Sequence, residues 1–386
     1  MLKAFKYRLY PTKEQATLIN KHIGATRFLY NLGLETKQIA YSTRKINLDC
    51  FTLIKQIPDL KTECEWLKEI NSQTLQMALR NLDNAFTRFF KGQGKYPNFK
   101  KKHSGGSFNI PQNVKLTNDK LIIPKFKEGI SIELHRPTKG TIKQATISRT
   151  PTGKYFVSVL CDTGEKLPTK APIKEQTTIG IDMGIKAFIT TSAGESYDNP
   201  KYLKKSLSQL KFVQRKFSKH KGKRTKQKLA KLHEKVANQR RDFLHKTSTA
   251  LIRESQTICI EDLNIKGMMK NHRLAQAVGD VGWHTFVSML AYKAEWNGVN
   301  ILQIGRFEPS SKLCNVCGHS FKELSLSDRE WTCSHCGTHH DRDENAAINI
   351  KKFALRNKLS GTESQTRDEL PALVGVLTPE ASIPLG

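Results

Sequence analysis

The chain has 386 residues, with 64 lysines and arginines against 35 aspartates and glutamates, so its formal net charge is +29. That length is enough for two or three domains with cores of their own. So large a positive excess repels itself in a compact fold, which favours nucleic acid as the partner over a membrane surface. No apolar run approaches the roughly 20 residues of a membrane-spanning helix, and the first ten residues lack the continuous apolar core of a signal peptide.

Four of the eight cysteines are scattered along the chain without a spacing that suggests pairing. They are Cys50, Cys64, Cys161 and Cys259. Isolated cysteines of this kind are typical of reduced, mostly buried thiols. We therefore expect a cytosolic protein.

Residues 2–10 alternate between apolar and polar or basic side chains, which predicts a half-buried strand with a basic outer face. Pro11 ends this strand. Thr12 and Gln15 then have the spacing of a capping box, which predicts the start of a helix. Helical patterns continue to about residue 91.

The clearest of these helices has leucines and phenylalanines at three- and four-residue spacing between Leu75 and Phe89. Its opposite face carries Ser72 and Gln76, followed by an arginine and an asparagine. This face is either an ordinary solvated surface or an array of polar groups suited to base edges in a DNA groove.

Residues 91–106 form a basic loop rich in glycine, and short β-patterns follow it. The predicted strands are Leu121–Ile123, Ile130–Leu134, Thr141–Ser148 and Tyr155–Cys161. Together with the first strand they predict a small β-barrel that a helical insertion interrupts. Residues 162–176 are typical of a linker into a second region.

Two later segments each end an apolar strand in an acid, namely Thr178–Asp182 and Thr257–Glu261. A carboxylate at a strand end is open to a cleft. Each acid also has an ordinary interpretation, because Asp182 could be a turn residue before Gly184 and Glu261 a solvated strand end. Ala187–Thr191 and Asn300–Ile304 predict further strands.

Between these segments, residues 201–246 contain 17 lysines and arginines but only two acids, Glu234 and Asp242. Leucines recur at helical spacing on both sides of a break near Gly222. A surface helix that serves only solubility mixes charges of both signs. We therefore predict an antiparallel pair of helices whose basic face contacts phosphates.

Two CxxC pairs, each followed by glycine, stand fifteen residues apart. Their cysteines are Cys314, Cys317, Cys333 and Cys336. This spacing lets two knuckles present four thiolates tetrahedrally to one Zn²⁺ ion, and four protein ligands indicate a structural site. Nearby histidines, including His319 and His340, could compete as ligands. Thiolates with knuckle glycines are the better match.

A third acid follows the cysteines, where Asp343 lies at the start of an Ala/Ile-rich helix. It could be a simple N-cap. Together with Asp182 and Glu261 it could instead complete a carboxylate site that holds two Mg²⁺ ions for phosphodiester hydrolysis. The pattern alone does not choose Glu261 over Asp262, or Asp343 over Asp341.

Several blocks of the chain, in this order, resemble conserved blocks of the transposon-encoded TnpB family, relatives of the type V CRISPR effectors. The blocks are GIDMGIKAF, IEDLNIKGM, RFEPSSKLCNVCG and CSHCGTHHDRDENAAINI. The N-terminal KAFKYRLYPTKEQ and SQTLQMALRNLDNAFTRFF also match the opening segments of the family. The resemblance therefore covers nearly the whole chain.

The resemblance implies an α+β multidomain fold in which a β-barrel wedge domain carries an inserted helical recognition domain. An RNase H-like (RuvC) α/β domain with a basic helical insertion and a four-cysteine zinc ribbon follows. The expected boundaries are 1–10 and 92–170 for the wedge, 11–91 for the recognition helices, and 171–361 for the RuvC-like domain. Within the last, the insertion spans 201–246 and the ribbon 310–340. From composition, we expect the tail at 362–386 to be disordered.

The resemblance also implies an activity, namely an RNA-guided DNA endonuclease. Its guide RNA comes from the transposon end, and its target is double-stranded DNA beside a short flanking motif. Asp182, Glu261 and Asp343 would then be the catalytic triad. Ser72, Gln76, Gln112 and Asn113 fall where the family reads the flanking motif. The expected location is the prokaryotic cytoplasm, acting at the nucleoid, and no protein oligomer is indicated.

Two other functions are compatible with the same residues. The zinc ribbon and the basic helices could only hold RNA or DNA, without catalysis. A transposase would also use carboxylates and metal ions, but would join strands instead of hydrolysing them.

Overall fold

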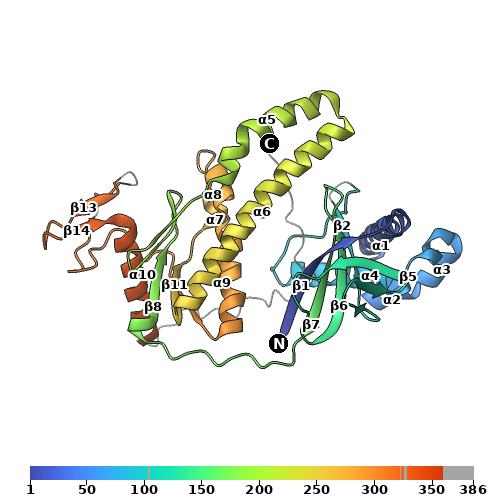
Figure 1. Ribbon diagram of the computed structural model, residues 1–386, viewed down its shortest axis with the longest axis horizontal. Coiled ribbons are helices and arrows are strands. Elements are labelled where there is room, and N and C mark those ends of the chain that lie inside the picture. The colour runs from blue at the N-terminus through green and yellow to red at the C-terminus, as the bar shows by residue number, and fades with distance from the viewer. Residues whose placement is uncertain (103–104, 322, 326–327, 360–386) are drawn as a thin grey trace. The chain divides into compact units, whose positions relative to one another are not determined.

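The computed structural model describes residues 1–102, 105–321, 323–325 and 328–359 (Figure 1). These residues divide into two compact units, residues 1–165 and residues 166–359. The division falls inside the segment predicted as a linker. The predicted disordered tail at 362–386 lies outside the described residues.

The first unit is built on a seven-stranded antiparallel sheet in the order β2-β6-β7-β1-β5-β4-β3. All five predicted strands are confirmed, whereas β2 and β3 were not predicted. Among the described residues the ladder ends at β2 and at the two-residue β3, and no pairing closes it into the predicted barrel. The strands are β1 (Leu2–Tyr10), β2 (Gly106–Ile110), β3 (Lys115–Leu116), β4 (Lys120–Ile123), β5 (Phe126–Glu133), β6 (Thr141–Arg149) and β7 (Tyr155–Asp162).

The helices of the first unit separate β1 from β2 along the chain, as predicted. They are α1 (Lys13–Arg44), α2 (Cys50–Lys55), α3 (Ile57–Glu63), the 3-10 helix η1 (Glu65–Glu69) and α4 (Ser72–Phe90). The capping box that begins α1 is present, because Thr12 and Gln15 each accept the other's backbone N–H, at 3.3 and 3.1 Å. Ile19 and Ile23 of α1 pack into the core of the sheet.

A buried histidine joins α1 to the start of α4. The Nε2 atom of His22 accepts the backbone N–H of Asn71 at 3.2 Å, and its Nδ1 lies 2.9 Å from the carbonyl of Leu18. Burial lowers the pKa of His22, so the ring is neutral and its Nδ1–H donates to Leu18. Because Asn71 caps α4, His22 fixes where that helix begins.

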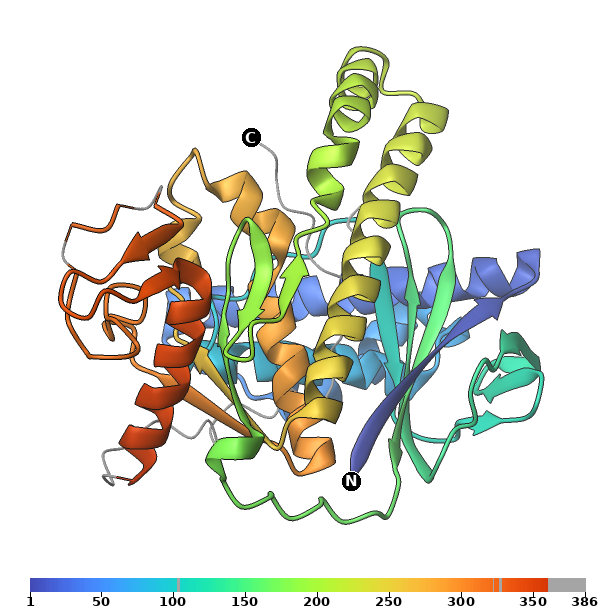
Figure 2. The ribbon, with the colours of Figure 1, turned by 60° about the vertical axis from the view of Figure 1, so that its left-hand side comes forward.

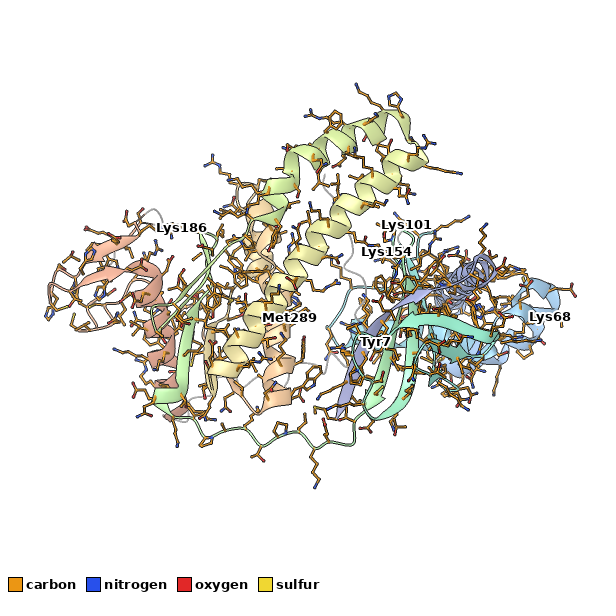
Figure 3. The ribbon with its side chains drawn as sticks, viewed as in Figure 1. Tyr7, Lys68, Lys101, Lys154, Lys186 and Met289 are labelled. Atoms are coloured by element: carbon orange, nitrogen blue, oxygen red, sulfur yellow. The ribbon has the colours of Figure 1, made fainter. Side chains whose placement is uncertain are left out.

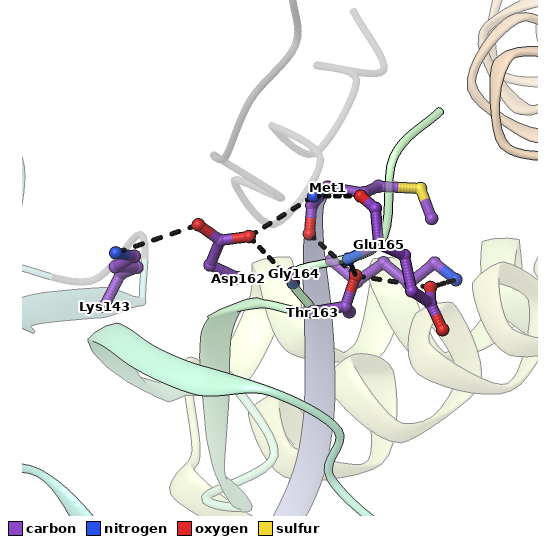
Figure 4. Close-up of polar contacts among 7 residues, drawn as sticks. Met1, Lys143, Asp162, Thr163, Gly164 and Glu165 are labelled. Carbon is purple, nitrogen blue, oxygen red and sulfur yellow. Dashed lines mark hydrogen bonds and ion pairs between the residues drawn. The ribbon is translucent and has the colours of Figure 1, made fainter. Parts of the chain in front are cut away.

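Polar contacts tie the start of β1 to the end of β7 (Figure 4). Asp162 accepts from the Met1 amino group at 3.3 Å and from the Gly164 N–H at 3.1 Å, and Lys143 lies 3.8 Å away. The Thr163 N–H donates to the Met1 carbonyl at 2.9 Å. These contacts hold the central strand of the sheet in register with its neighbour.

The second unit is built on a five-stranded sheet in the order β10-β9-β8-β11-β12. Strands β8, β11 and β12 are parallel, and β9 and β10 continue the sheet in antiparallel pairs. Its predicted strands are confirmed, and β10 is an addition. The strands are β8 (Thr178–Asp182), β9 (Ala187–Thr191), β10 (Ser196–Asp198), β11 (Thr257–Glu261) and β12 (Asn300–Ile304).

Helices cover both faces of this sheet. Leu251 of α6 and Phe286 of α9 pack with Ile181 and Ile260 on one face, and Ile350 of α10 packs with Cys259 on the other. The helices are η2 (Glu175–Thr177), α5 (Tyr202–His220), α6 (Lys223–Glu254), α7 (Ile265–Met268), α8 (Ala275–Val281), α9 (Trp283–Asn297) and α10 (Arg342–Leu359). A small hairpin, β13 (Glu330–Thr332) and β14 (His339–Asp341), precedes α10.

Helices α5 and α6 form the predicted antiparallel pair and lie side by side in both views (Figures 1 and 2). The break falls at Lys221 and Gly222, as predicted, but α6 continues to Glu254 instead of ending near residue 246. In Figure 3, Lys68 and Lys186 project from the ribbon, whereas Tyr7 and Met289 are buried side chains. None of the described helices is long and apolar enough to cross a membrane.

Candidate active site

Asp182 and Glu261 lie side by side at the carboxyl edge of the second sheet. They end the parallel neighbours β8 and β11, whose register pairs Ile181 with Ile260, so the two acids follow at the same level. Side chains alternate along a strand. Because Ile181 and Ile260 face α6 and α9, both acids face the α10 side.

Asp343 reaches the same edge from α10, because this helix approaches β8 very closely. A Cβ atom on Gly180 would lie 2.0 Å from the carbonyl oxygen of Ala347, so only glycine permits the contact. Asp343 is four residues before Ala347, a rise of about 6 Å. Asp182 is two residues after Gly180, about 6.6 Å along the strand. The packing therefore brings Asp343 level with Asp182.

The electrostatics agree with this convergence. Burial, followed by the negative charges of Asp343 and Glu261, raises the pKa of Asp182 to about 7. Burial and the charge of Asp262 raise the pKa of Glu261. A buried carboxyl group whose pKa two nearby acids raise further is unfavourable as a purely structural feature, and divalent cations would relieve the repulsion.

The neighbouring acids that the sequence left open have other partners. Asp341 caps α10, because its Oδ1 accepts the backbone N–H groups of Asp343 and Glu344, both at 2.9 Å. Asp262 forms an ion pair with Arg306 at 2.6 Å. The N-cap interpretation therefore applies to Asp341 and not to Asp343. Asp343 faces instead the guanidinium of Arg329, 3.6 Å away.

The four cysteines are gathered tightly, with all four sulfur atoms within 4.8 Å of one another. Cys314 lies 3.7 Å from Cys336, and Cys317 lies 3.6 Å from Cys333. Thiolates at about 2.3 Å from a tetrahedral Zn²⁺ ion are about 3.8 Å apart, so the donor set fits zinc. Among the described residues, no other group of three or more potential ligands is gathered in this way.

The surroundings of the sulfurs favour a thiolate at Cys336 but not at Cys317. Against a hydrogen bond from the His319 N–H, burial and hydrogen bonds to the other three sulfurs raise the pKa of Cys317. Hydrogen bonds from Thr338 lower the pKa of Cys336 to about 6. The buried His340 places its Nε2 3.1 Å from the sulfur of Cys314, where it contacts a ligand and is not itself in the four-residue group. Gly318 and Gly337 turn the two knuckles with φ of 76° and 71°.

Two buried asparagines of α10 connect the first cysteine knuckle to the helix that carries Asp343. The side chain of Asn345 accepts the Asn315 N–H and donates to the Leu313 carbonyl, both at 2.9 Å. Asn349 donates to the carbonyls of Ser310 and Leu313, at 2.8 and 2.6 Å. The cysteine-bearing segment is therefore fixed to the same helix turn that positions Asp343.

The four predicted DNA-reading residues all lie in the first unit. Ser72 begins α4, where its hydroxyl accepts from Lys61 at 2.6 Å, and Gln76 follows one turn later. Gln112 and Asn113 are exposed in the turn after β2. Strand β2 packs on α4, and Thr74 donates to the carbonyl of Asn109 at 3.1 Å. The two pairs thus belong to adjoining elements, and their role stays a prediction.

Sequence reasoning missed the residues that position the acids, chiefly Gly180, Arg329, Asn345 and Asn349. A glycine inside an apolar strand is a signal of close backbone approach that could have indicated Gly180. The asparagines lie four residues apart, and therefore on one face of a predicted helix. No sequence pattern indicates which carboxylate Arg329 faces.

Three sequence families match this chain. One described as "Probable transposase" matches residues 158–272, "Cas12f1-like, TNB domain" matches residues 283–350, and "Helix-turn-helix domain" matches residues 1–45. In the last range the structure has one strand and one long helix, β1 and α1, so that description does not fit the fold seen here.

Relatives match over almost the full length. A protein of Streptomyces pristinaespiralis, named as a candidate RNA-guided DNA endonuclease, is 40% identical over 93% of this chain and 91% of its own. Escherichia coli InsQ, named in the same way, is 30% identical over 90% and 91%. A TnpB-like protein of Acanthamoeba polyphaga mimivirus, L770, is 23% identical over 91% and 73%. The chain belongs to the TnpB family.

A solved structure has the same fold. The Cas12f1 protein in a complex with single guide RNA and target DNA aligns with a TM-score of 0.55 and 13% identity, over 88% of this chain and 83% of that chain. At this identity the similarity concerns the fold alone. It supports the α+β architecture.

Proposed function

We propose that this protein is an RNA-guided DNA endonuclease that hydrolyses phosphodiester bonds at Asp182, Glu261 and Asp343. The observation that carries the proposal is the environment of Asp182 at the end of β8, where burial and the charges of Asp343 on α10 and Glu261 on β11 raise its pKa to about 7. The chain has a net charge of +29, so it has enough lysines and arginines to neutralise acidic side chains. Acids that nevertheless repel one another are typical of a divalent-metal site.

The donor set fits Mg²⁺, which prefers carboxylate oxygens. Two such ions, when bound, would activate a water molecule and stabilise the leaving oxygen of the scissile phosphate. Asp182, Glu261 and Asp343 would hold them, and Asp182 would release its proton on binding because its pKa is otherwise about 7. Arg329, next to Asp343, places a positive charge where a phosphate would arrive.

The other parts of the chain would hold the nucleic acids. We propose a guide RNA derived from the transposon end, whose base pairing with double-stranded target DNA supplies the sequence specificity. The basic faces of α5 and α6 would contact phosphates. Ser72, Gln76, Gln112 and Asn113 would read a short flanking DNA motif. The cysteines would bind one structural Zn²⁺ ion, and the enzyme would work in the cytoplasm on nucleoid DNA.

The test begins with the RNA that copurifies with the full-length protein. Sequencing it identifies the guide, and a DNA duplex that matches it is the substrate. In Mg²⁺ the wild-type protein should cleave this duplex, whereas Asp182→Asn, Glu261→Gln and Asp343→Asn should lose cleavage by about a thousandfold or more and still bind. Glu175→Gln, an exposed acid far from the sheet edge, is the matched control and should cleave normally. Full cleavage by a triad variant would contradict the proposal.

The description of one matching family as a transposase favours a second candidate, strand transfer. It uses the same carboxylates, but the attacking group is a DNA 3′-hydroxyl and not water. Joined donor–target products on a substrate with transposon ends would support it. Breaks without joined products would support the nuclease.

A further inference from the structure

The most exposed large apolar side chain of the described residues follows a strand that ends at the same sheet edge as two of the acids. Phe307 is 94% exposed, and the next, Phe90, is 75% exposed. Phe307 follows β12, which runs parallel to β11 with Ile304 paired to Glu261. The ring therefore lies three residues beyond the level of Glu261, at the same edge of the sheet.

The loop that carries Phe307 is fixed on both sides. Arg306 forms an ion pair with Asp262 at 2.6 Å and also donates to the Asp262 carbonyl, directly after Glu261. On the other side Glu308 lies 3.9 Å from Arg356 of α10. The Ser310 carbonyl accepts from the buried Asn349 at 2.8 Å. The ring is thus held in solvent by an anchored backbone and is not exposed because the loop is loose.

The residues that flank Phe307 in the chain indicate what covers it. Arg306 and Glu308 are both charged, so this turn offers no run of apolar side chains that a protein partner would bury. A flat ring among charged groups matches a nucleotide base, whose face stacks on aromatic side chains. A base offers that face only when it is unpaired.

We infer that Phe307 stacks on an unpaired base of the DNA strand that enters the carboxylate site, and so holds the scissile phosphate at Asp182, Glu261 and Asp343. This inference rests on the proposed function. Phe307 is a substrate-binding residue in this assignment and takes no part in proton transfer. Stacking accepts any base, which suits an enzyme whose specificity comes from a guide.

The first measurement is binding without cleavage. Full-length protein with its copurified RNA and the Asp182→Asn change is mixed with matching DNA that carries 2-aminopurine at one position at a time. We expect one position near the cut site to change its fluorescence on binding. Adding Phe307→Ala should abolish that change, and Phe307→Trp should keep it. Phe51→Ala, which removes another exposed ring, on α2 of the first unit, is the matched control and should leave it unaltered.

The second measurement is cleavage by otherwise wild-type protein. Phe307→Ala and Phe307→Leu should raise KM about tenfold while kcat changes less, and Phe307→Trp should stay within about twofold of the wild type. An abasic site at the position found by fluorescence should impair the wild type and remove its advantage over Phe307→Ala. Equal impairment of both proteins by the abasic site would overturn the stacking.

The outcomes separate the two proposals. A fluorescence change that survives Phe307→Ala overturns the stacking, whether or not the protein cleaves DNA. A change that needs Phe307, in a protein that never cleaves, overturns the nuclease and leaves the stacking in place. A dimer in sedimentation that Phe307→Ala dissociates would also overturn the inference, because a second copy would then cover the ring.

Discussion

The cysteine group and the acid group lie in the same unit but are held in opposite ways. The four sulfurs lie within 4.8 Å of one another, surrounded by hydrogen-bond donors such as Thr338. Asp182, in contrast, is buried beside two like charges that raise its pKa to about 7. Hydrogen bonds stabilise the first arrangement, whereas the second depends on the packing of β8 and α10.

The way in which each group is held is what we expect of a structural metal site for the cysteines and of a reactive site for the acids. A structural metal site has its full set of protein ligands and a supporting shell of hydrogen bonds. A reactive site keeps open positions and strained charges, and it is destabilising on its own. The two groups are connected through Asn345 and Asn349, so disturbing either group tests how far they depend on each other.

The largest effect is expected from Cys333→Ser, which removes a buried sulfur of the proposed zinc site. Structural zinc contributes about 10–16 kcal/mol to local order. The zinc content measured by mass spectrometry should therefore fall from one ion per chain to none, and hydrogen exchange across residues 310–340 should rise. Cleavage should be lost as well, because the segment that fixes α10 is no longer ordered.

Cys64→Ser is the control for that experiment, since Cys64 lies in the first unit, far along the chain from the group. It should keep one zinc ion. Asp182→Asn should also keep its zinc, which would separate loss of the metal from loss of activity. A Cys333→Ser protein with normal zinc would show that His340 or another group replaces the missing ligand.

A second test removes the charge strain and should stabilise the protein. The folded pKa of Asp182 lies above the usual value of 3.8, so folding favours its protonated form. The resulting stability is complete below pH 3.8 and is lost as pH rises through about 7. At pH 8 in EDTA, Asp182→Asn should therefore raise the free energy of unfolding of the second unit, by at most about 4 kcal/mol.

Hydrogen exchange of the β8 and β11 peptides measures this effect within the second unit. Between pH 5 and pH 8 the wild type should lose protection and Asp182→Asn should not. Adding Mg²⁺ should protect the wild type more than the variant. The cation neutralises the repelling carboxylates of the wild type, and the variant has one carboxylate fewer. Equal protection of the two proteins in EDTA at pH 8 would mean that Asp182 is not strained.

The elements themselves could be predicted from the sequence, because their signals are local. Alternation and helical spacing located β1, β8, β11 and α4, and the Lys221–Gly222 break located the turn between α5 and α6. The short β2, β3 and β10 lack such a signal. Their pairing partners decide that they are strands, and a single sequence does not contain that information.

The acids could be found for the same reason, since each ends or begins a regular element. The choice of Asp343 over Asp341 could not be derived from the pattern, because both lie at the start of α10 and either could cap it. The hydrogen bonds show that Asp341 caps the helix, and the role of Asp343 stays a prediction. The ion pair of Asp262 with Arg306 likewise depends on tertiary structure, across 44 residues of chain.

A third test moves the helix that carries Asp343. In Gly180→Ala the new Cβ would lie 2.0 Å from the Ala347 carbonyl, so α10 must shift from β8. Overpacking of this kind costs about 1–3 kcal/mol, and we expect slower cleavage at unchanged zinc content. Gly24→Ala is the counterpart, because nothing lies within 4 Å of its Cβ inside α1. It should be neutral or stabilise the first unit by up to about 1 kcal/mol.

The smallest effect is expected from Asn345→Ala, which breaks hydrogen bonds between the cysteine-bearing segment and α10. Asn345→Ala leaves the Asn315 N–H without its partner, whereas the Leu313 carbonyl keeps its hydrogen bond from Asn349, so the change costs about 1 kcal/mol. The cysteines keep their sulfurs, so the zinc content should stay at one ion. If the knuckle helps to hold Asp343, kcat should fall about tenfold with little change in binding. Lys358→Ala, on the exposed last turn of α10, should change neither. A normal kcat in Asn345→Ala would mean that the packing of Gly180 against Ala347 positions Asp343 by itself, and that the cysteine group serves another part of the protein.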